Sequence, residues 1–383
     1  MSIFCYLCTQ KNKYMTKICC FFNYPPHYRY AIYKSIDNTF DCDFYFGDDV
    51  FQPLKTFDVH RLHGFKSFLK AKMTNIKGYI WHKGSYKLFK TSYSYYIVTG
   101  ESCILVNWLL ILWTKITKKK LIMWTHGINQ HYPKKTSLLI YKIFYRSADI
   151  LLMYSKYNLK YMTDLGCKTD KIYYIHNSLN TDFQNEIYAN LHESNIYSKH
   201  FNNNNPVVIY IGRLQKRKRI EQLIEAIDFL NKEGEKINLV LIGDNSDAEY
   251  LQLLVKTKGL EKTTWFYGPS YDEIQNSELI YNASVCVCPA AIGLTAIHAL
   301  SYGCPIISNN NLSTQMPECE CIRDNVTGSF FKENDINDLS SKILYWCSLS
   351  HSQRDNFRKE ARNLILQEWS IDYQINILKK IIA

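Results

Sequence analysis

The sequence contains no apolar run long enough to cross a bilayer, which takes about 20 residues. The prominent run at 103–113 stops well short of that length. Lys11, Lys13 and Lys17 interrupt the N-terminal segment, so there is no signal-peptide pattern and we expect a cytoplasmic protein. The thirteen cysteines form no repeating framework, which suits a reducing compartment rather than a disulfide-stabilised fold.

Two motifs are also missing. No Gly-x-Gly-x-x-Gly follows the first apolar strand of either half, which argues against a dinucleotide-dependent oxidoreductase. The triplet Asp41-Cys42-Asp43 leads into a strand of the first half, where we do not expect a metal ion. No internal repeat of solenoid length is present.

Basic residues outnumber acidic ones by 46 to 35, for a net charge of +11. This excess favours anionic partners such as nucleotides or an acidic membrane surface, although a lysine-rich solvated surface explains it equally well. We expect no nucleic-acid partner, because the basic residues cluster on one turn rather than beside stacking aromatics. With 383 residues, 46% of them hydrophobic, the chain is long enough for two folded domains.

Short apolar runs alternate with amphipathic stretches along both halves of the chain. That alternation predicts strands joined by helices, and therefore parallel sheets covered on both faces. The expected strands are 18–22, 44–46, 95–99, 121–125, 150–154 and 172–175 in the first half, and 207–211, 238–242, 264–267, 284–288 and 305–308 in the second.

The polar segment 184–205 interrupts this rhythm and ends in an Asn-rich tract before Pro206, which cannot continue a helix. We predict an α/β fold of two Rossmann-like domains facing a central cleft. The predicted boundaries are 1–183 for the first domain, 184–205 for a linker, 206–365 for the second domain and 366–383 for an amphipathic helix that crosses back to the first.

One turn in the second half carries concentrated positive charge. The apolar run Val207–Ile211 is followed by Gly212 and Arg213 and, five positions after that arginine, by Lys218. Parallel α/β sheets bind ligands at the C-terminal ends of their strands, where arginine and lysine can converge on one anion. A solvated basic loop is the alternative explanation.

A second turn supplies the complementary part of this anion site. The stretch Pro289–Gly293 leads directly into an expected helix. The N–H groups of Leu294 and Thr295 then fall in its first turn, where they favour negative charge. Gly293 lacks a Cβ and lets the backbone approach a ligand closely. Together the two turns predict a clamp for a diphosphate.

The apolar run 103–113 is followed by Lys115 and by Lys118–Lys120. A helix buried against a sheet is one explanation, since strand-like runs flank it. The other explanation places its lysines on an anionic membrane face. Both hold if only the basic end of the helix is exposed.

Several motifs, in order along the chain, resemble retaining glycosyltransferases of the GT-B fold. The resemblance is to the large glycogen-synthase-like family that builds bacterial surface polysaccharides. In the second half the motifs are Gly212-Arg213-Leu214 with Lys218, Leu241-Ile242-Gly243-Asp244, Phe266-Tyr267-Gly268, and Pro289–Leu294 followed by Gly303-Cys304-Pro305. In the first half they are Phe22–Arg29, Trp124-Thr125-His126-Gly127 and Ile175–Asn180.

This resemblance implies roles for the domains and for individual residues. The first domain would bind the acceptor, and the second a nucleotide-diphosphate sugar. His126, Arg213 and Lys218 would form the catalytic set, the last two by neutralising the departing diphosphate. The implied donor-binding residues are Gly212, Arg213, Lys218, Gly243, Asp244, Gly268, Pro269, Ala290, Gly293, Leu294, Thr295, His298 and Glu318, and those implied on the acceptor side are Tyr24, His27 and Asn177.

The chain departs from the family pattern at two positions. Most relatives carry two glutamates eight positions apart around the glycine turn, and here those positions hold Ala290 and His298. A carboxylate beside the donor sugar is therefore missing. The ribose contact would pass to an imidazole, which can still bond a hydroxyl.

The leading hypothesis is transfer of a sugar from a nucleotide-diphosphate sugar to a hydroxyl of a saccharide acceptor, with retention, in capsule or O-antigen synthesis. We expect no metal and no cofactor, because protein cations take the role of a divalent ion. A lipid-linked acceptor would bring the protein to the inner face of the cell membrane, in peripheral contact with anionic lipid. Two alternatives stay open: a catalytically silent nucleotide-sugar-binding partner of another transferase, for which Ala290 and His298 argue, and a nucleotide-sugar epimerase.

Overall fold

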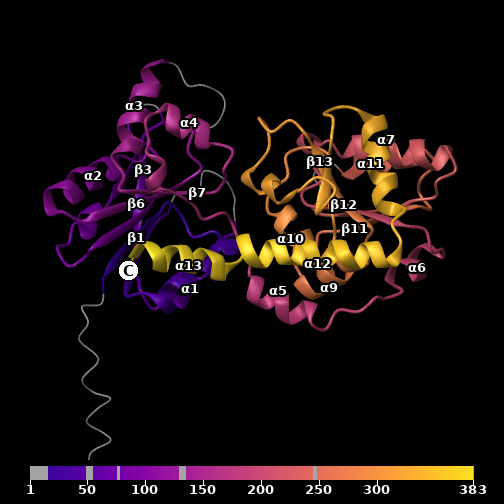
Figure 1. Cartoon of the computed structure of the whole chain (residues 1–383), viewed down its shortest axis with the longest axis horizontal. Helices are drawn as coiled ribbons and strands as arrows, with labels where there is room; N and C mark the ends of the chain where they lie inside the picture. Colours follow the sequence, from indigo (N-terminus) through magenta and orange to yellow (C-terminus); the bar gives the residue numbers. More distant parts are fainter. Residues whose placement is uncertain (1–15, 49–54, 76–77, 129–134, 245–247, 383) are drawn as a thin grey trace, which may run out of the picture. The chain divides into compact units, whose positions relative to one another are not determined.

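The structure is a computed structural model that describes residues 16–48, 55–75, 78–128, 135–244 and 248–382. Its contacts divide the chain into two compact units. The first consists of residues up to Ile175 together with those from Gln374 onward, and the second of His176–Tyr373. The end of the chain, expected to return to the first domain, thus groups with the first unit. Each unit is built on one sheet (Figure 1).

The first unit contains an eight-stranded sheet in the order β4-β3-β2-β1-β5-β6-β7-β8. Strands β3 and β4 pair antiparallel, and all other neighbours pair parallel. The strands are β1 (Ile18–Phe22), β2 (Cys42–Gly47), β3 (Phe65–Met73), β4 (Ile80–Lys83), β5 (Tyr95–Thr99), β6 (Lys120–Thr125), β7 (Ile150–Met153) and β8 (Ile172–Tyr174). The α-helices are α1 (Tyr30–Thr39), α2 (Leu105–Thr117), α3 (Lys135–Arg146) and α4 (Leu159–Asp164).

Neighbouring residues of β1 show why this sheet is covered on both faces. Phe21 packs into a core that also contains Leu110 of α2 and Phe144 of α3. Phe22 points the other way, and its ring stacks on Tyr33 of α1 with ring centroids 4.6 Å apart. Because successive strand residues face opposite sides, a continuous apolar strand needs a helical layer on each face.

Three strands were not expected from the sequence. In β3, exposed positions alternate with half-buried ones over much of its length, because it is next to the edge strand β4 and only weakly covered. Such strands commonly carry lysines that discourage pairing with other chains, and these lysines hide the apolar pattern. The third missed strand, β14 (Gly328–Phe331), is short and lies at the edge of the second sheet.

The second unit contains a six-stranded, entirely parallel sheet in the order β11-β10-β9-β12-β13-β14. Its other strands are β9 (Val207–Ile211), β10 (Asn238–Ile242), β11 (Thr264–Gly268), β12 (Val285–Cys288) and β13 (Ile306–Asn309). The helices are α5 (Thr181–Tyr188), α6 (Ile196–Phe201), α7 (Ile220–Lys232), α8 (Ala248–Thr257), α9 (Glu273–Asn282), α10 (Thr295–Ser301), α11 (Ile336–Cys347) and α12 (His351–Glu368), and the chain closes with α13 (Ile371–Ile382). Helix α11 packs on α7, whereas α10 packs on α12 and α5, and Figure 1 shows these two groups on opposite sides of the sheet.

The segment 184–205, expected as a linker, is structured and belongs to the second unit. It holds most of α5 and all of α6. Tyr197 and Phe201 of α6 enter the core of the second unit, and the Tyr197 hydroxyl donates to the Leu279 carbonyl at 2.5 Å. Two aromatic anchors therefore fix a stretch whose overall composition is polar.

Asp43, from the Asp-x-Asp triplet, is buried near the start of β2. Its carboxylate accepts a hydrogen bond from the Tyr93 hydroxyl at 2.6 Å and pairs with Lys17 and Lys66. It is a structural ion-pair centre. Among the described residues, no helix is long and apolar enough to span a membrane, and no group of three or more His, Cys, Asp or Glu residues could hold a metal ion.

Candidate functional site

The strand order of the second sheet reverses between β9 and β12. Since both strands are parallel, the loops that follow them leave from the same edge, the usual ligand-binding position of such sheets. These loops enclose a cavity of about 20 Å³, enough for a water-sized group such as one phosphate oxygen. Five of the residues predicted from the sequence line it together: Gly212, Lys218, Ala290, Gly293 and Thr295.

Lys218 provides the positive charge of this cavity. Its ammonium group donates to the Ala291 carbonyl at 2.8 Å, which joins the β9 loop to the β12 loop. Burial lowers the pKa of Lys218, and the charges of Arg217 and Arg213 lower it further while Glu318 opposes them. A partly dehydrated ammonium gains more from an anionic ligand than a fully hydrated one does.

Arg213 lies next to this lysine on the exposed side of the loop. Its carbonyl accepts a hydrogen bond from the buried Tyr210 hydroxyl at 2.9 Å, which fixes the backbone at the end of β9. Its guanidinium donates to no other residue of the described chain. It therefore remains available to a ligand, as predicted for a diphosphate-binding arginine.

The glycines that end β9 and β10 bring two backbones unusually close together. A Cβ on Gly243 would lie 1.8 Å from the Gly212 carbonyl oxygen, a distance no side chain can adopt. The Gly243 N–H donates to the Gly268 carbonyl at 3.0 Å, so the ends of β9, β10 and β11 are locked together. Of the other residues predicted here, Asp244 and Pro269 are exposed.

The glycine turn between β12 and α10 behaves differently. The Gln315 side chain accepts from the Ile292 N–H at 2.9 Å, and the Thr295 hydroxyl donates to the Ile211 carbonyl at 3.2 Å. A Cβ on Gly293 would meet nothing closer than Met316, at 4.0 Å. The fold itself does not require glycine here, so the open space beside it is accessible to a ligand.

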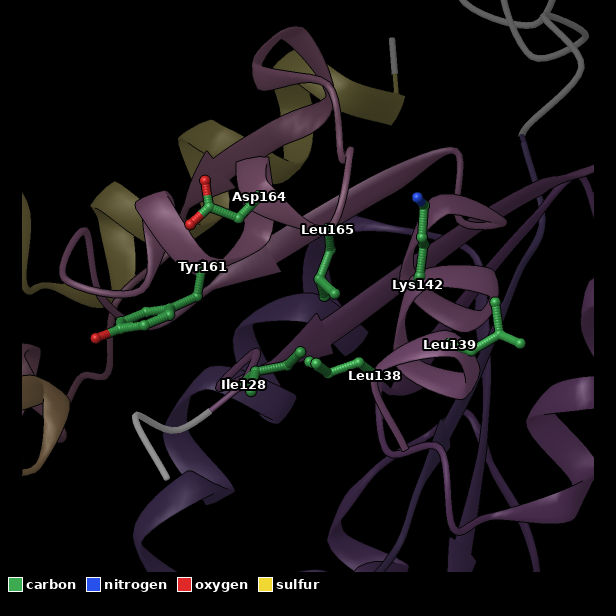
Figure 2. Close-up of a pocket in the computed structure, with 7 residues that line it drawn as sticks. All are labelled: Ile128, Leu138, Leu139, Lys142, Tyr161, Asp164 and Leu165. Carbon is green, nitrogen blue, oxygen red and sulfur yellow. The ribbon is translucent and has the colours of Figure 1, made fainter. Parts of the chain in front are cut away.

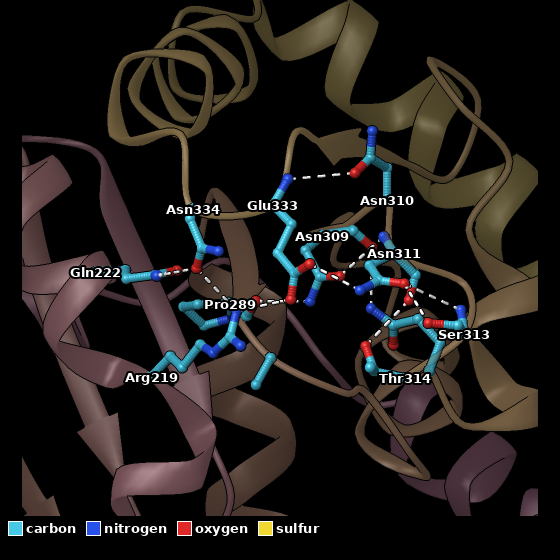
Figure 3. Close-up of polar contacts among 12 residues, drawn as sticks. Arg219, Gln222, Pro289, Asn309, Asn310, Asn311, Ser313, Thr314, Glu333 and Asn334 are labelled. Atoms are coloured by element: carbon cyan, nitrogen blue, oxygen red, sulfur yellow. Dashed lines mark hydrogen bonds and ion pairs between the residues drawn. The ribbon is translucent and has the colours of Figure 1, made fainter. Parts of the chain in front are cut away.

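A polar network holds the loops that follow β9 and β12 in place (Figure 3). Asn309 donates to the Pro289 carbonyl at 2.8 Å. Arg219 and Asn311 donate to the two oxygens of Glu333, at 2.8 Å and 2.7 Å. The β9 loop is therefore tied to the loops after β13 and β14, and the β12 loop to the end of β13.

Glu318 supplies a carboxylate close to Lys218. It is buried in the short helix that follows the loop after β13, and it accepts a hydrogen bond from the Asn177 amide at 2.5 Å. Asn177, predicted on the acceptor side, thus lies in the second unit, bonded to a predicted donor-side residue. Although Ala290 has no carboxylate, this part of the chain retains one on a different segment.

His298 points toward a residue that the sequence did not single out. Its Nε2 lies 3.1 Å from an oxygen of Glu273 in α9. The same oxygen accepts from the Tyr302 hydroxyl at 2.7 Å and the Gln184 amide at 3.0 Å. Burial alone would raise the pKa of Glu273, but the bonds from His298, Gln184 and Tyr302 lower it to about 2. The imidazole therefore has a carboxylate partner within its own unit.

In the first unit, an arginine organises the C-terminal edge of the sheet. The Arg29 guanidinium donates to the Tyr154 hydroxyl and lies 5.1 Å from the Trp124 ring centroid. The predicted His126 lies against the Tyr154 ring with centroids 4.2 Å apart. Burial, with the nearby Arg29 charge, lowers the pKa of His126 to about 4. The imidazole is therefore neutral at physiological pH.

The two other residues predicted in this unit have different surroundings. Tyr24 lies close enough to Arg29 and Tyr154 to feel their charges. Burial and the neighbouring Tyr28 raise the pKa of Tyr24, whereas Arg29 lowers it. His27 is exposed, and its Nδ1 lies 3.1 Å from the Lys55 carbonyl. The structure thus brings Tyr24 and His126 toward one arginine and leaves His27 at the surface.

Glu101 is a further carboxylate at this edge, just after β5. Burial raises its pKa to about 7, and its charge influences Tyr145 and Tyr154. Its side chain makes no hydrogen bond to another residue within the described ranges. Its position just after an apolar strand is a sequence feature that indicates a binding edge. A single glutamate at such a position is too common to indicate a functional residue.

Comparison with known proteins identifies this architecture. Residues 193–364 match the family described as Glycosyl transferases group 1. This match covers most of the second unit. The whole chain also has the GT-B fold: a crystal structure of Anabaena HepE in complex with UDP has a TM-score of 0.71 at 14% identity, covering 96% of this chain and 99% of that one.

Two bacterial proteins are similar in sequence to parts of this chain. An uncharacterized 41.2 kDa protein in the cps region of Klebsiella pneumoniae is 24% identical over 261 residues, 65% of this chain and 66% of that protein. The lipopolysaccharide 1,6-galactosyltransferase of Salmonella typhimurium is 27% identical over 141 residues, 35% of this chain and 37% of that protein. The chain thus spans just under two thirds of the first relative and little more than a third of the second.

Proposed function

We propose that this protein transfers a sugar from a nucleotide-diphosphate sugar to a hydroxyl of a saccharide acceptor, with retention of anomeric configuration, in surface-polysaccharide synthesis. The observation that carries the proposal is Lys218. Its partly dehydrated ammonium lies between the β9 and β12 loops with Arg213 beside it, where a GT-B glycosyltransferase needs cations for a leaving diphosphate.

The proposed chemistry follows from these positive charges. The bond between the sugar C1 and the β-phosphate oxygen breaks, and the acceptor oxygen bonds to C1 on the same face. The departing phosphate takes the acceptor's proton. Lys218 and Arg213 stabilise the charge that develops on the phosphate, and the N–H groups at the start of α10 add to this field. The charge of Glu318 opposes the lowering of the Lys218 pKa and so favours the ammonium form.

The donor and acceptor classes have separate support. HepE, whose fold this chain shares, was crystallised with UDP, which supports a nucleotide-diphosphate donor here. The acceptor would bind near Tyr24 and His126. The names of the relatives, a cps-region protein and a lipopolysaccharide galactosyltransferase, support a surface-saccharide acceptor, which we propose is lipid-linked at the inner membrane face. The silent-partner alternative and the epimerase are not favoured, because residues 193–364 match a glycosyltransferase family and one relative is named as a galactosyltransferase.

The test measures donor binding and turnover together. Nucleotide sugars are screened for an increase in melting temperature, since a ligand of the folded state stabilises it, and the best donor is assayed with lipid-linked saccharides. Lys218→Ala and Arg213→Ala should each lower turnover about 10²–10³-fold, while Lys216→Ala, in the same turn but exposed, should change it little. We expect turnover to persist with a metal chelator and the product to keep the donor's anomeric configuration by NMR. Wild-type rates in both variants would contradict the proposal, and an inverted product would contradict retention.

A further inference from the structure

Helix α2 carries an apolar stripe on the side that faces away from its own sheet. Leu109, Leu112 and Ile116 are 40%, 61% and 79% exposed. Their spacing of three and four residues places them on one face of the helix. The opposite side is buried in the core through Val106 and Leu110, so this stripe is not needed for folding.

Helix α3, which contacts α2, carries exposed aliphatic side chains of its own. Leu139 and Ile143 are 60% and 51% exposed, while Phe144 is buried in the core that contains Leu110 of α2. The two helices touch, because the rings of Trp108 and Phe144 lie with centroids 5.1 Å apart. We call the set Leu109, Leu112, Ile116, Leu139 and Ile143 the α2–α3 face.

The charged residues on these two helices all have one sign. Helices α2 and α3 contain no acidic residue. Lys115, Lys118, Lys142 and Arg146 are exposed on them or directly after them, and none forms an ion pair with another described residue. Exposed aliphatic side chains beside unpaired cations are typical of segments that rest in the headgroup region of an anionic membrane.

A shallow apolar cavity adjoins α3. It has a volume of about 330 Å³, and its apolar lining includes Ile128, Leu138, Leu139 and Leu165, while Lys142, Tyr161 and Asp164 are its polar residues. Figure 2 shows Ile128 and Leu138 pointing toward each other across it. Because Leu139 and Lys142 belong both to this cavity and to the exposed side of α3, the apolar surface extends toward the loop that carries His126.

We propose that the α2–α3 face seats the protein on an anionic lipid bilayer. This deepens the proposed function, since it gives a lipid-linked acceptor a surface to arrive on, but the contact itself is independent of the transfer step. The sequence indicated only the lysines at the end of α2. The structure adds the five exposed aliphatic side chains and the second helix that together make a surface.

The experiment is co-sedimentation of the full-length protein with phosphatidylcholine vesicles that contain or lack phosphatidylglycerol. We expect binding only with phosphatidylglycerol. Leu112→Asp should weaken it about tenfold or more, and Lys115→Glu at least about fivefold. The matched control is Leu253→Asp in α8, because Leu253 is 63% exposed and should leave binding unchanged. Melting temperatures show that each variant is folded.

Three outcomes would overturn the proposal: no binding to anionic vesicles, equal losses in Leu112→Asp and Leu253→Asp, or a lipid-independent dimer that only Leu112→Asp dissociates. The last would make the face an interface between two copies of this chain. Transfer to a water-soluble saccharide separates this proposal from the proposed function. Leu112→Asp should leave that activity unchanged, whereas a failure of the transferase itself would abolish it in the wild type.

Discussion

The His298 imidazole lies 3.1 Å from the Glu273 carboxylate at the start of α9. This contact joins α10 to α9 through an imidazole and a carboxylate. One imidazole nitrogen faces Glu273, so only Nδ1 could reach a ribose hydroxyl.

Placing a glutamate here with His298→Glu should therefore destabilise the protein. Two carboxylates would face each other where an imidazole and a carboxylate now pair. We expect a loss of about 1–3 kcal/mol in the free energy of unfolding, measured by urea denaturation at neutral pH. Adding Glu273→Gln should recover most of that loss. Full stability of the single variant would mean that the two side chains do not face each other.

Glu101 predicts a pH dependence of stability. Burial raises the pKa of its folded form to about 7, from 4.5, so the unfolded chain releases this proton first as pH rises. Stability present below pH 4.5 is therefore lost between pH 4.5 and 7. Glu101→Gln should match the wild type near pH 4 and exceed it at pH 8 by on the order of 2 kcal/mol. The exposed Glu261 is the control position, and an unchanged pH profile in Glu101→Gln would show that its carboxyl is fully hydrated.

The two loop glycines should respond oppositely to alanine. Gly243→Ala drives a Cβ into the Gly212 carbonyl and should unfold the second unit or destabilise it by more than about 3 kcal/mol. Gly293→Ala meets only Met316 at contact distance, so stability should change by less than about 0.5 kcal/mol. Donor binding should nevertheless weaken, because the new methyl group occupies space beside the ligand. Thermal melts with and without the nucleotide sugar separate the effects, and unchanged donor affinity in Gly293→Ala would place the ligand elsewhere.

Arg219 adopts the left-handed backbone conformation, with φ of 52°, held by its side-chain bonds to Glu333 and Asn334 (Figure 3). Both Arg219→Ala and Arg219→Gly remove those bonds, but only glycine also relieves the backbone. We expect the glycine variant to be more stable than the alanine variant by about 1 kcal/mol, the reverse of the order inside a helix. Urea midpoints measure the difference, and an alanine variant of equal or greater stability would rule out backbone strain at this position.

The parts of the site predicted from the sequence are those set by local chain geometry. Gly212, Lys218 and Gly293 follow strands whose buried apolar runs are continuous, so their place at one edge follows from a parallel sheet. The Glu273–His298 pair could not be predicted this way, because it joins two helices through a contact that no periodicity encodes. Glu101 was missed for a related reason: its unusual proton affinity arises from surroundings assembled only in three dimensions.

The same distinction explains the missed elements of the fold. The central strands are covered on both faces, so their sequences are almost uniformly apolar. By contrast, β3 carries lysines that an edge region tolerates. The segment before β9 is rich in asparagine, yet it is structured because Tyr197 and Phe201 anchor α6 in the core. Composition averaged over such a segment conceals two decisive side chains.

The bond from Lys218 to the Ala291 carbonyl has a consequence for discrimination among anions. An anionic ligand must displace the Ala291 carbonyl before it can bind the Lys218 ammonium. An ion with few other contacts, such as free phosphate, therefore gains little binding free energy at this position. A nucleotide diphosphate also contacts the protein through its base, its ribose and its second phosphoryl group. Those contacts offset the free energy of breaking the internal hydrogen bond. The Ala291 carbonyl thus competes with every anion for Lys218, and this competition favours nucleotide diphosphates over free phosphate.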